Sequence, residues 1–495
     1  NSWNYGEAFS DNKTELKFNE MFEAITAAVT EGRPTDDGAL GSVIVFAAGN
    51  YGEDGDSSNY HSFTSTHETI SVGSIGEMGD ASSTTSAGSS ILVSAPGEGI
   101  VTTDLVGQLG FSTGDYHYDF GGTSAAAPIV SGVVALMLEA NPKLGYRDVQ
   151  EILAYSSVNP KGETWLSNAA STSSGGGLTF SDEYGFGLVD AHAAVRLAET
   201  WTETSTASNL ISVSKKETQD LDILDTDVVS DTLTISKSDL ATGSEELLLD
   251  HVEVDLTLSH SFVGDLLIEL ESPGGTTSVL MDRPLKGTYE GTGKLEFAFD
   301  TVQFWGETVI GNWTLHVTDT ETGNTGTVEE WALNLYGDTY SEDTNYIFTD
   351  EWNSLGADAA RNTIEDTAGY DTFNFSAMTS VVDLDMNVNA VSLVGDAPMV
   401  IASTTLVEKA VGGDAADTLS GNAEANTLFG MRGDDQLFGM AGDDILYGGA
   451  GNDLITGGYG TDTAHYSGAR SNYAVLTNAD GSTIVYDKTG VDGID

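Results

Sequence analysis

A glycine opens a new nine-residue block six times in the C-terminal part of the chain, and this period constrains the fold more than any other feature. The blocks begin with Gly412, Gly421, Gly430, Gly439, Gly448 and Gly457. The eighth position of the first five blocks is apolar, namely Leu419, Leu428, Leu437, Leu446 and Ile455. Glycine permits a tight left-handed turn, so the period predicts a parallel β-roll with these apolar residues inside. A glycine-rich linker is the alternative, and six blocks in phase disfavour it.

The blocks resemble G-G-x-G-x-D-x-U-x, the Ca²⁺-binding repeat of toxin-like secreted proteins. The resemblance implies that the carboxylates at position six are oxygen ligands of Ca²⁺, namely Asp417, Asp435, Asp444, Asp453 and Asp462. The first two blocks depart from the motif at Ala415 and Asn426, so we expect their sites to be weak or absent. If consecutive blocks lie on alternate sides of the roll, blocks two apart stack. Asp435 should then share an ion with Asp453, and Asp444 with Asp462.

The composition fits a protein that binds cations. The chain of 495 residues has a formal charge of −59, from 77 acidic against 18 basic residues. This charge would repel the phosphates of nucleic acid, and it also suits solubility in salty water. There is no cysteine, so an extracellular form would need a staple such as Ca²⁺ in place of disulfides. We find no apolar run of the roughly 18–20 residues that cross a membrane.

The segment Phe120-Gly121-Gly122-Thr123-Ser124-Ala125-Ala126-Ala127-Pro128 places one serine where a long apolar helix begins. The residues behind it are too apolar to face water, which predicts a buried helix: Ile129, Val130, Val133, Val134, Leu136, Met137 and Leu138. We expect Pro128 in the first turn, where a missing N–H costs little. Unpaired N–H groups at a helix N-terminus suit a developing oxyanion. The alternative is that Ser124 is only an N-cap.

Asn50 follows an apolar strand, Val43–Ala48, and could donate its amide to the same oxyanion. A turn-forming asparagine is the alternative. Other patterns predict strands at Thr69–Val72 and Ile91–Val93, and helices at Met21–Gly32, Leu144–Ser156 and Ala191–Trp201. This alternation predicts an α/β region with a mostly parallel sheet covered by helices.

Gly-Thr-Ser-Ala-Ala-Ala-Pro at Ser124 and Ala-Ala-Gly-Asn at Asn50 resemble the nucleophile and oxyanion segments of subtilisin-like serine proteases, most closely the kexin and furin branch. The start Asn1-Ser2-Trp3 resembles the segment after their catalytic His. The resemblance implies that Ser124 is the nucleophile and Asn50 the oxyanion-hole amide. An α/β-hydrolase is disfavoured, because its nucleophile elbow needs G-x-S-x-G and position 126 is alanine.

A serine nucleophile needs a base, usually a His oriented by a carboxylate. In the family this His stands in a His-Gly-Thr context, and none of the eight His residues here has that context. We therefore expect residues 1–202 to be the C-terminal part of a subtilase domain truncated at its N-terminus, and we expect this piece alone to be catalytically crippled.

The expected specificity pocket departs from the family. Kexin and furin cleave after basic residues because carboxylates and a bound Ca²⁺ line the pocket for the residue before the scissile bond. An ungapped alignment from Asn50 puts His61 at the place of a pocket Asp and Ser86 at the place of a Ca²⁺-ligating Glu, while Asp56 keeps its acid. A plain loop acid is the alternative for Asp56. These exchanges favour a specificity other than for basic residues.

Residues 203–340 change to strands with alternating apolar residues, including Val252, Val254, Leu256, Leu258, Leu266, Ile268 and Leu270. The segments Gly264–Leu266, Ser272–Thr276 and Leu335–Gly337 resemble the P domain that follows kexin-type catalytic domains. The resemblance implies an antiparallel jelly-roll β-sandwich that stabilises the protease. An unrelated carbohydrate-binding sandwich is the alternative.

The remaining segments flank the repeats. Residues 341–411 resemble the flank of the β-roll in serralysin-type secreted proteases, most clearly at Gly369–Ser376 and Val411–Gly413. The repeats occupy residues 412–466. Residues 467–495 contain a closing β segment that stops abruptly at Asp495, and we expect this end to be truncated too.

Together these patterns predict a secreted, Ca²⁺-dependent serine endopeptidase, bacterial in origin, that acts on protein or peptide substrates. The chain would then consist of part of an α/β subtilase domain, an all-β sandwich and a parallel β-roll. A non-catalytic, Ca²⁺-stabilised extracellular adhesion or surface protein with a relic protease region is the rival hypothesis. Asp and His-Gly-Thr motifs in the upstream sequence would distinguish the two.

Overall fold

The computed structural model describes residues 1–2, 7–160, 164–170, 176–218, 220–241, 244, 246–289, 293–358, 361–478, 483–490 and 492–495. Trp3 of the N-terminal motif lies outside these residues. The chain divides into two compact units, one made of Asn1–Ala170 and Leu178–Tyr340, the other of Ser171–Gly177 and Ser341–Asp495. The finer boundaries at 202, 411 and 466 stay predictions.

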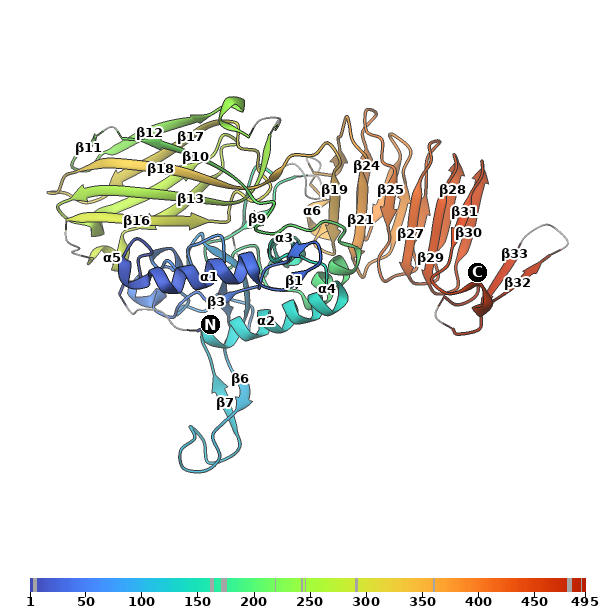
Figure 1. The fold of residues 1–495 in the computed structure, drawn as a ribbon, viewed down its shortest axis with the longest axis horizontal. Helices are drawn as coiled ribbons and strands as arrows, with labels where there is room; N and C mark the ends of the chain where they lie inside the picture. Colours follow the sequence, from blue (N-terminus) through green and yellow to red (C-terminus); the bar gives the residue numbers. More distant parts are fainter. Residues whose placement is uncertain are drawn as a thin grey trace. The chain divides into compact units, whose positions relative to one another are not determined.

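The N-terminal region contains a parallel three-stranded sheet, of which Figure 1 labels the first strand, β3 (Val45–Ala47). Its strands are β3, β4 (Ile70–Ile75) and β5 (Ile91–Pro96), adjacent in this order. Four helices accompany it: α1 (Asn19–Glu31), α2 (Thr123–Ala140), α3 (Tyr146–Ser156) and α4 (Ala191–Thr200). Because helix α2 packs against all three strands and Ile25 of α1 shares a core with Phe46 of β3, the strands are almost wholly buried. The predicted α/β region is confirmed.

This region also contains short pairs of antiparallel strands: β1 (Pro34–Thr35) with β2 (Gly38–Ala39), β6 (Ile100–Thr103) with β7 (Tyr116–Phe120), and β8 (Leu166–Ser167) with β9 (Thr179–Phe180). The β6–β7 hairpin projects away from the rest of its unit and leads directly into α2 (Figure 1). Helix α3 begins at Tyr146, two residues later than predicted, because Gly145 is its N-cap.

Helix α2 differs from its prediction in three ways. Pro128 is its sixth residue rather than part of the first turn, so the Ser124 carbonyl lacks the usual N–H four residues on. Only one face is buried, through Val130, Val133 and Met137, while the side chain of Leu136 is about half exposed. By length and composition alone this 18-residue helix meets the criterion for crossing a membrane. Its packing against the sheet is that of a core helix.

Residues 211–339 form two antiparallel sheets packed face to face. One has the order β10 (Ile211–Glu217), β18 (Gly326–Thr339), β13 (Leu247–His260), β16 (Lys294–Thr301), with β11 (Leu221–Ile223) beside β18. The other has the order β12 (Val228–Ile235), β17 (Gly311–Asp319), β14 (Leu266–Glu271), β15 (Thr277–Asp282). The inward residues alternate as predicted, and Leu256 pairs with Trp331 across the first sheet. The short turn α5 (Pro284–Gly287) has left-handed backbone at Leu285 and Lys286. The predicted β-sandwich is confirmed.

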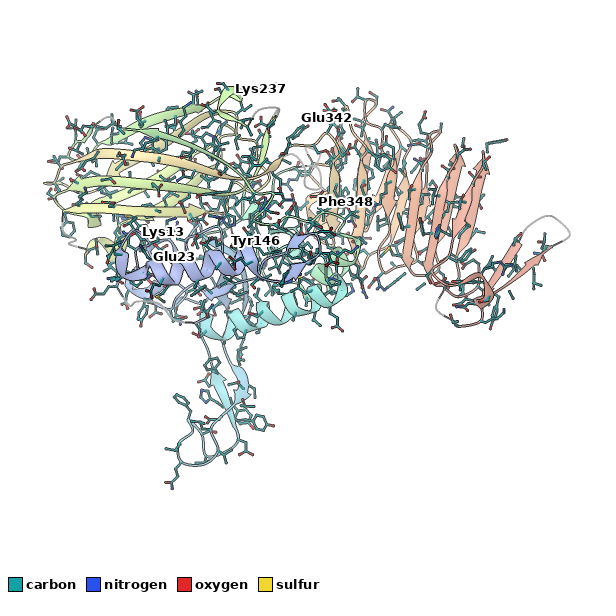
Figure 2. All side chains as sticks on the ribbon, in the orientation of Figure 1. Lys13, Glu23, Tyr146, Lys237, Glu342 and Phe348 are labelled. Carbon is teal, nitrogen blue, oxygen red and sulfur yellow. The ribbon has the colours of Figure 1, made fainter. Side chains whose placement is uncertain are left out.

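The sandwich and the α/β region share one core. The ring of Phe9 lies 5.1 Å from that of Phe297 and 4.9 Å from that of Tyr60. Lys13 reaches from the N-terminal segment to Glu253 of β13, and Figure 2 shows it at the boundary between the α/β region and the sandwich. These contacts make the two regions a single compact unit.

The second unit is a roll of two stacks of strands, which are parallel except that β23 pairs antiparallel with both β22 and β24. One stack has the order β19 (Asn345–Thr349), β21 (Thr372–Ala377), β25 (Lys409–Val411), β27 (Thr427–Arg432), β29 (Ile445–Ala450), β31 (Thr463–His465). The other has the order β20 (Thr363–Ile364), β24 (Ala397–Ile401), β23 (Val391–Val394), β22 (Val382–Asp385), β26 (Thr418–Ser420), β28 (Gln436–Ala441), β30 (Leu454–Tyr459). Helix α6 (Trp352–Leu355) and the hairpin of β32 (Tyr473–Thr477) with β33 (Thr483–Asp487) complete the unit.

Blocks two apart stack on each other, as the nine-residue period predicts. Leu437 pairs with Ile455, and Leu428 pairs with Leu446. Leu419, Leu428, Leu437 and Leu446 are almost wholly buried in a core shared with Trp352, and Ile455 is partly buried against it. The predicted β-roll is confirmed.

Candidate active site and metal centre

Ser124 is the second residue of α2 and is half-buried. Gly122 precedes the helix with a φ of 87°, a left-handed conformation that lets the chain turn sharply from β7 into the helix. Ala125, Ala126 and Ala127 are buried behind the serine and fix the first turn. Within the described residues, neither the backbone N–H nor the side chain of Ser124 has a hydrogen-bond partner. The serine therefore presents a free hydroxyl and a free N–H at a helix N-terminus.

Asn50 lies beside this N-terminus, because the loop after β3 meets the start of α2. The backbone N–H of Thr123 donates to Asn50 Oδ1 at 2.8 Å, and the Thr123 hydroxyl donates to the same oxygen at 2.9 Å. Thr123 Oγ1 in turn accepts the Gly49 N–H at 3.2 Å. The side-chain oxygen of Asn50 is thus fully engaged, while its Nδ2 donates to no acceptor among the described residues. Thr123 thus orients the Asn50 amide so that the N–H groups of Nδ2 remain free.

The backbone of Gly122 also lies close to the Asn50 side chain. A Cβ at Gly122 would lie 2.8 Å from Asn50 Oδ1. Gly122 is therefore required twice, for its positive φ and for the close approach of the amide.

Several described histidines contact residues other than Ser124. His61 pairs with Asp56, His251 with Asp300 and His260 with Asp319. His67 is stacked on Tyr336, with ring centroids 4.1 Å apart. Among the residues that the structure describes, none donates to or accepts from Ser124. The sequence prediction that residues 1–495 carry no base for this serine stays a prediction.

The position of the expected specificity pocket is filled by a buried cluster. His61 Nε2 lies 3.0 Å from Asp56 Oδ1, and its Nδ1 makes an ion-pair contact of 3.4 Å with Asp11 Oδ1. Ser86 Oγ donates to Asp56 Oδ2 at 2.8 Å. Burial lowers the pKa of His61, but the hydrogen bonds and charges of Asp11 and Asp56 outweigh burial and raise it to about 9. The imidazolium is the cation that these two carboxylates hold.

The repeat aspartates form two ladders in the roll. The N–H of Asp435 donates to Asp453 Oδ1 at 2.9 Å, and the N–H of Asp444 donates to Asp462 Oδ1 at 3.2 Å. The stacking thus brings Asp435 to Asp453 and Asp444 to Asp462, and the shared ion in each pair stays a prediction.

In three of these aspartates the second carboxylate oxygen is available to bind a cation. Oδ2 of Asp435, Asp444 and Asp453 is buried and has no hydrogen-bond partner in the described residues. A buried carboxylate oxygen without a partner is costly. Burial, together with the charges of Asp417 and Asp453, raises the pKa of Asp435 to about 8. These orphaned oxygens fit Ca²⁺, which takes carboxylate and carbonyl oxygens.

Asp417 and Asn426, in the first two blocks, differ from the others. Asp417 accepts the N–H of Val382 on one oxygen and the N–H of Gly413 on the other, both at 2.8 Å. Asn426 accepts the N–H of Asn422 at 2.8 Å. Both side chains accept hydrogen bonds from the protein itself, and the weakness of these two sites stays a prediction.

No three His, Asp or Glu side chains gather into a metal-binding group within the described ranges. A Ca²⁺ ion at these aspartates would need further oxygen ligands, such as backbone carbonyls of the turns. Sequence reasoning missed Asp11, Thr123 and Asp495. Thr123 lies within the Gly-Thr-Ser motif quoted for Ser124, which could have singled it out, whereas Asp11 and Asp495 belong to no motif.

Three known protein families match successive regions of the chain. Residues 1–187 match the Subtilase family, and residues 249–335 match the Proprotein convertase P-domain. Residues 411–446 and 438–468 match the RTX calcium-binding nonapeptide repeat. Ca²⁺ is the cofactor that these matches imply.

Similar proteins include Protease KEX1 of Kluyveromyces lactis, 34% identical over 325 residues that cover 64% of this chain and 40% of the relative. Human furin is 35% identical over 328 residues, which cover 64% of this chain and 38% of furin. The chain thus spans about two fifths of the length of these curated relatives. A serine protease of Aeromonas sobria, solved with its chaperone, shares the fold with a TM-score of 0.57 at 24% identity, over 68% of this chain and 70% of that one.

Proposed function

The chain carries a subtilase domain, a proprotein convertase P domain and RTX calcium-binding repeats, and we propose that it is the nucleophile-bearing part of a secreted, Ca²⁺-dependent serine endopeptidase. The observation that carries the proposal is the pair of unengaged donors at the start of α2, the Ser124 N–H and the Asn50 amide, beside an unengaged Ser124 hydroxyl. An N-cap serine would spend its hydroxyl on the helix.

In this proposal Ser124 Oγ attacks the carbonyl of the scissile peptide bond. The negative charge that develops on the carbonyl oxygen is held by the Ser124 N–H and by Asn50 Nδ2, which Thr123 has oriented in advance. A His that takes the proton from Oγ and an Asp that orients this His would come from protein outside residues 1–495. The peptide C–N bond then breaks, the amine leaves with the proton from this His, and water hydrolyses the Ser124 acyl ester to release the second product and free the serine.

The substrates are proteins or peptides, and we propose that cleavage does not require a basic residue before the scissile bond. Asp11 and Asp56 are buried and both face His61, so neither carboxylate is available to a substrate Arg or Lys. An imidazolium at this place would also repel a basic side chain. The RTX repeats, which are typical of extracellular proteins, support secretion.

The proposal is tested by casein hydrolysis with the full-length gene product in Ca²⁺. Ser124→Ala should abolish hydrolysis, whereas Ser131→Ala, on the same helix, should leave it unchanged, because Ser131 Oγ only donates to the Ala127 carbonyl. Hydrolysis by the Ser124→Ala variant at the parent rate would refute the assignment. An inactive parent with intact upstream motifs would favour a non-catalytic surface protein.

A further inference from the structure

Three residues from outside the repeats, Gly493-Ile494-Asp495, reproduce the turn Gly451-Asn452-Asp453. The matched family of nonapeptide repeats stops at residue 468. Strand β30 belongs to the stack in which Asp417, Asp435 and Asp453 follow one another at intervals of 18 residues. The next member would be residue 471, which is a serine. The chain instead returns from β33 and lays residues 493–495 on the turn that precedes β30.

The glycines show this repetition in the backbone. A Cβ at Gly451 would overlap the carbonyl oxygen of Gly433, one level below. A Cβ at Gly493 would overlap the carbonyl oxygen of Gly451 in the same way. Both glycines have a positive φ, 153° at Gly451 and 71° at Gly493. Gly493 therefore takes the place of the glycine of a further level.

The next two residues continue the match. The N–H of Asn452 donates to Asp434 Oδ1 at 2.9 Å, and the N–H of Ile494 donates to Asn452 Oδ1 at 3.2 Å. The N–H of Asp435 donates to Asp453 Oδ1 at 2.9 Å, and the N–H of Asp453 donates to Asp495 Oδ1 at 2.8 Å. Asp495 thus holds the same relation to Asp453 that Asp453 holds to Asp435.

The C-terminal hairpin holds this segment in place. Asp495 exchanges two backbone hydrogen bonds with Val485 of β33, at 2.7 and 2.9 Å. Asp492 accepts hydrogen bonds from the hydroxyls of Tyr473 and Ser467. Tyr473 and Asp492 are both buried. The segment is therefore built into the end of the roll by contacts of its own.

The carboxylates around Asp453 are not neutralised by a basic side chain of the described residues. Asp453 is 5% exposed, and its Oδ2 has no hydrogen-bond partner in the described part of the chain. Asp434, Asp492 and Asp495 lie near enough to act on it electrostatically. No ion pair with a basic side chain involves Asp453, Asp492 or Asp495 among the described residues. Carboxylate and carbonyl oxygens are the ligands that Ca²⁺ prefers.

We propose that Asp495, together with Asp453, forms an additional Ca²⁺ site at the end of the roll, supplied from outside the nonapeptide repeats. The stack of Asp444 and Asp462 has no such addition, because no side chain in the described residues accepts the N–H of Asp462. The extra site belongs to one stack only, and it ties the C-terminal hairpin to the Ca²⁺-bound state of the repeats.

The test is the Ca²⁺ stoichiometry of the 495-residue chain, measured by calorimetric titration after chelation. Asp495→Asn keeps an Oδ1 that can accept the Asp453 N–H but removes the charge, so it should bind one Ca²⁺ fewer per chain while its circular dichroism in Ca²⁺ is unchanged. Asp383→Asn removes the charge of an exposed carboxylate on β22 and should bind as many ions as the parent.

A second variant separates a Ca²⁺ ligand from a merely structural cap. Asp495→Ala loses both the charge and the acceptor for the Asp453 N–H, and it should bind one Ca²⁺ fewer, as Asp495→Asn does. A structural cap would be kept in Asp495→Asn and lost only in Asp495→Ala. An Asp495→Asn variant with the parent's stoichiometry and affinities would overturn the proposal, whatever the behaviour of Asp495→Ala.

Discussion

His61 Nε2 lies 3.0 Å from Asp56 Oδ1, and both side chains are buried. With Asp11 on the other ring nitrogen, the imidazole links the N-terminal segment to the loop after β3. The two carboxylates raise the pKa of His61 above its ordinary value in spite of burial, to about 9. The protonated ring is therefore part of the fold at neutral pH.

This pair predicts a pH dependence of stability. A pKa raised from about 6.5 in the unfolded chain to about 9 stabilises the fold fully below pH 6.5, by on the order of 3 kcal/mol, and this contribution is lost as the pH rises through 9. In urea unfolding at constant Ca²⁺, the stability gap between the parent and His61→Gln should shrink from pH 6 to pH 9.5. His192→Gln, at an exposed position on α4, is the matched control and should show a much smaller change of the gap with pH. A gap that stays constant with pH would mean that His61 is neutral.

The Thr123–Asn50 contact predicts graded losses of activity in the full-length protein. Asn50→Ala should lower kcat by about 10²–10³ with little change in KM, because the amide acts only on the developing oxyanion. Thr123→Val removes the hydroxyl that orients Asn50 and should cost several-fold, whereas Thr123→Ser keeps it and should be close to the parent. Equal rates for Asn50→Ala and the parent would show that Asn50 only shapes a turn.

Arg147 joins the α/β region to the sandwich. From α3 its guanidinium donates to Asp250 of β13 and to Asp338 of β18, with Nη1 3.1 Å from Asp338 Oδ1. Arg147 is 2% exposed, so its removal leaves the buried carboxylate of Asp250 without this charged partner. Glu151 lies in the same cluster, where burial and the neighbouring acids raise its pKa.

We therefore expect Arg147→Ala to destabilise the first unit by about 3–5 kcal/mol. The measurement is chemical unfolding followed by tryptophan fluorescence. Lys216→Ala breaks the exposed Lys216–Glu330 pair between β10 and β18 and should cost less than about 1 kcal/mol. Similar losses in the two variants would show that the Arg147 contacts contribute no more than a surface pair.

Removal of Ca²⁺ should unfold the repeats. Without the ion, the carboxylates of Asp435, Asp444 and Asp453 keep a buried oxygen without a partner, and the core beneath them is small. Hydrogen exchange should therefore be fast in peptides from 412–466 in chelator and slow in Ca²⁺, while peptides from 249–335 stay protected in both. Equal protection of the repeats in both conditions would contradict Ca²⁺ binding there.

Local patterns predicted much of this structure from the sequence. The nine-residue period fixed the stacking and the pairs Asp435–Asp453 and Asp444–Asp462. Alternation along β13 and β14 predicted the sandwich. These features repeat at short intervals, so the sequence displays them directly.

Contacts between distant residues could not be predicted in this way. Asp11 meets His61 across 50 positions of the chain, and Arg147 finds Asp338 across 191. Asp495 continues a ladder from Asp453 with no repeat motif around it. Helix α2 was expected to be buried all round, because its composition is apolar, but packing on a single sheet leaves Leu136 half exposed.

The central claim is that Ser124 is an activated nucleophile. The most direct measurement is reaction of the full-length protein with a fluorophosphonate in Ca²⁺, followed by mass-spectrometric mapping of the adduct. We expect one adduct, on Ser124, that is lost when the protein is denatured first, and no adduct on Ser131. An active protein whose adduct lies on another serine, with Ser124 unmodified, would contradict the claim.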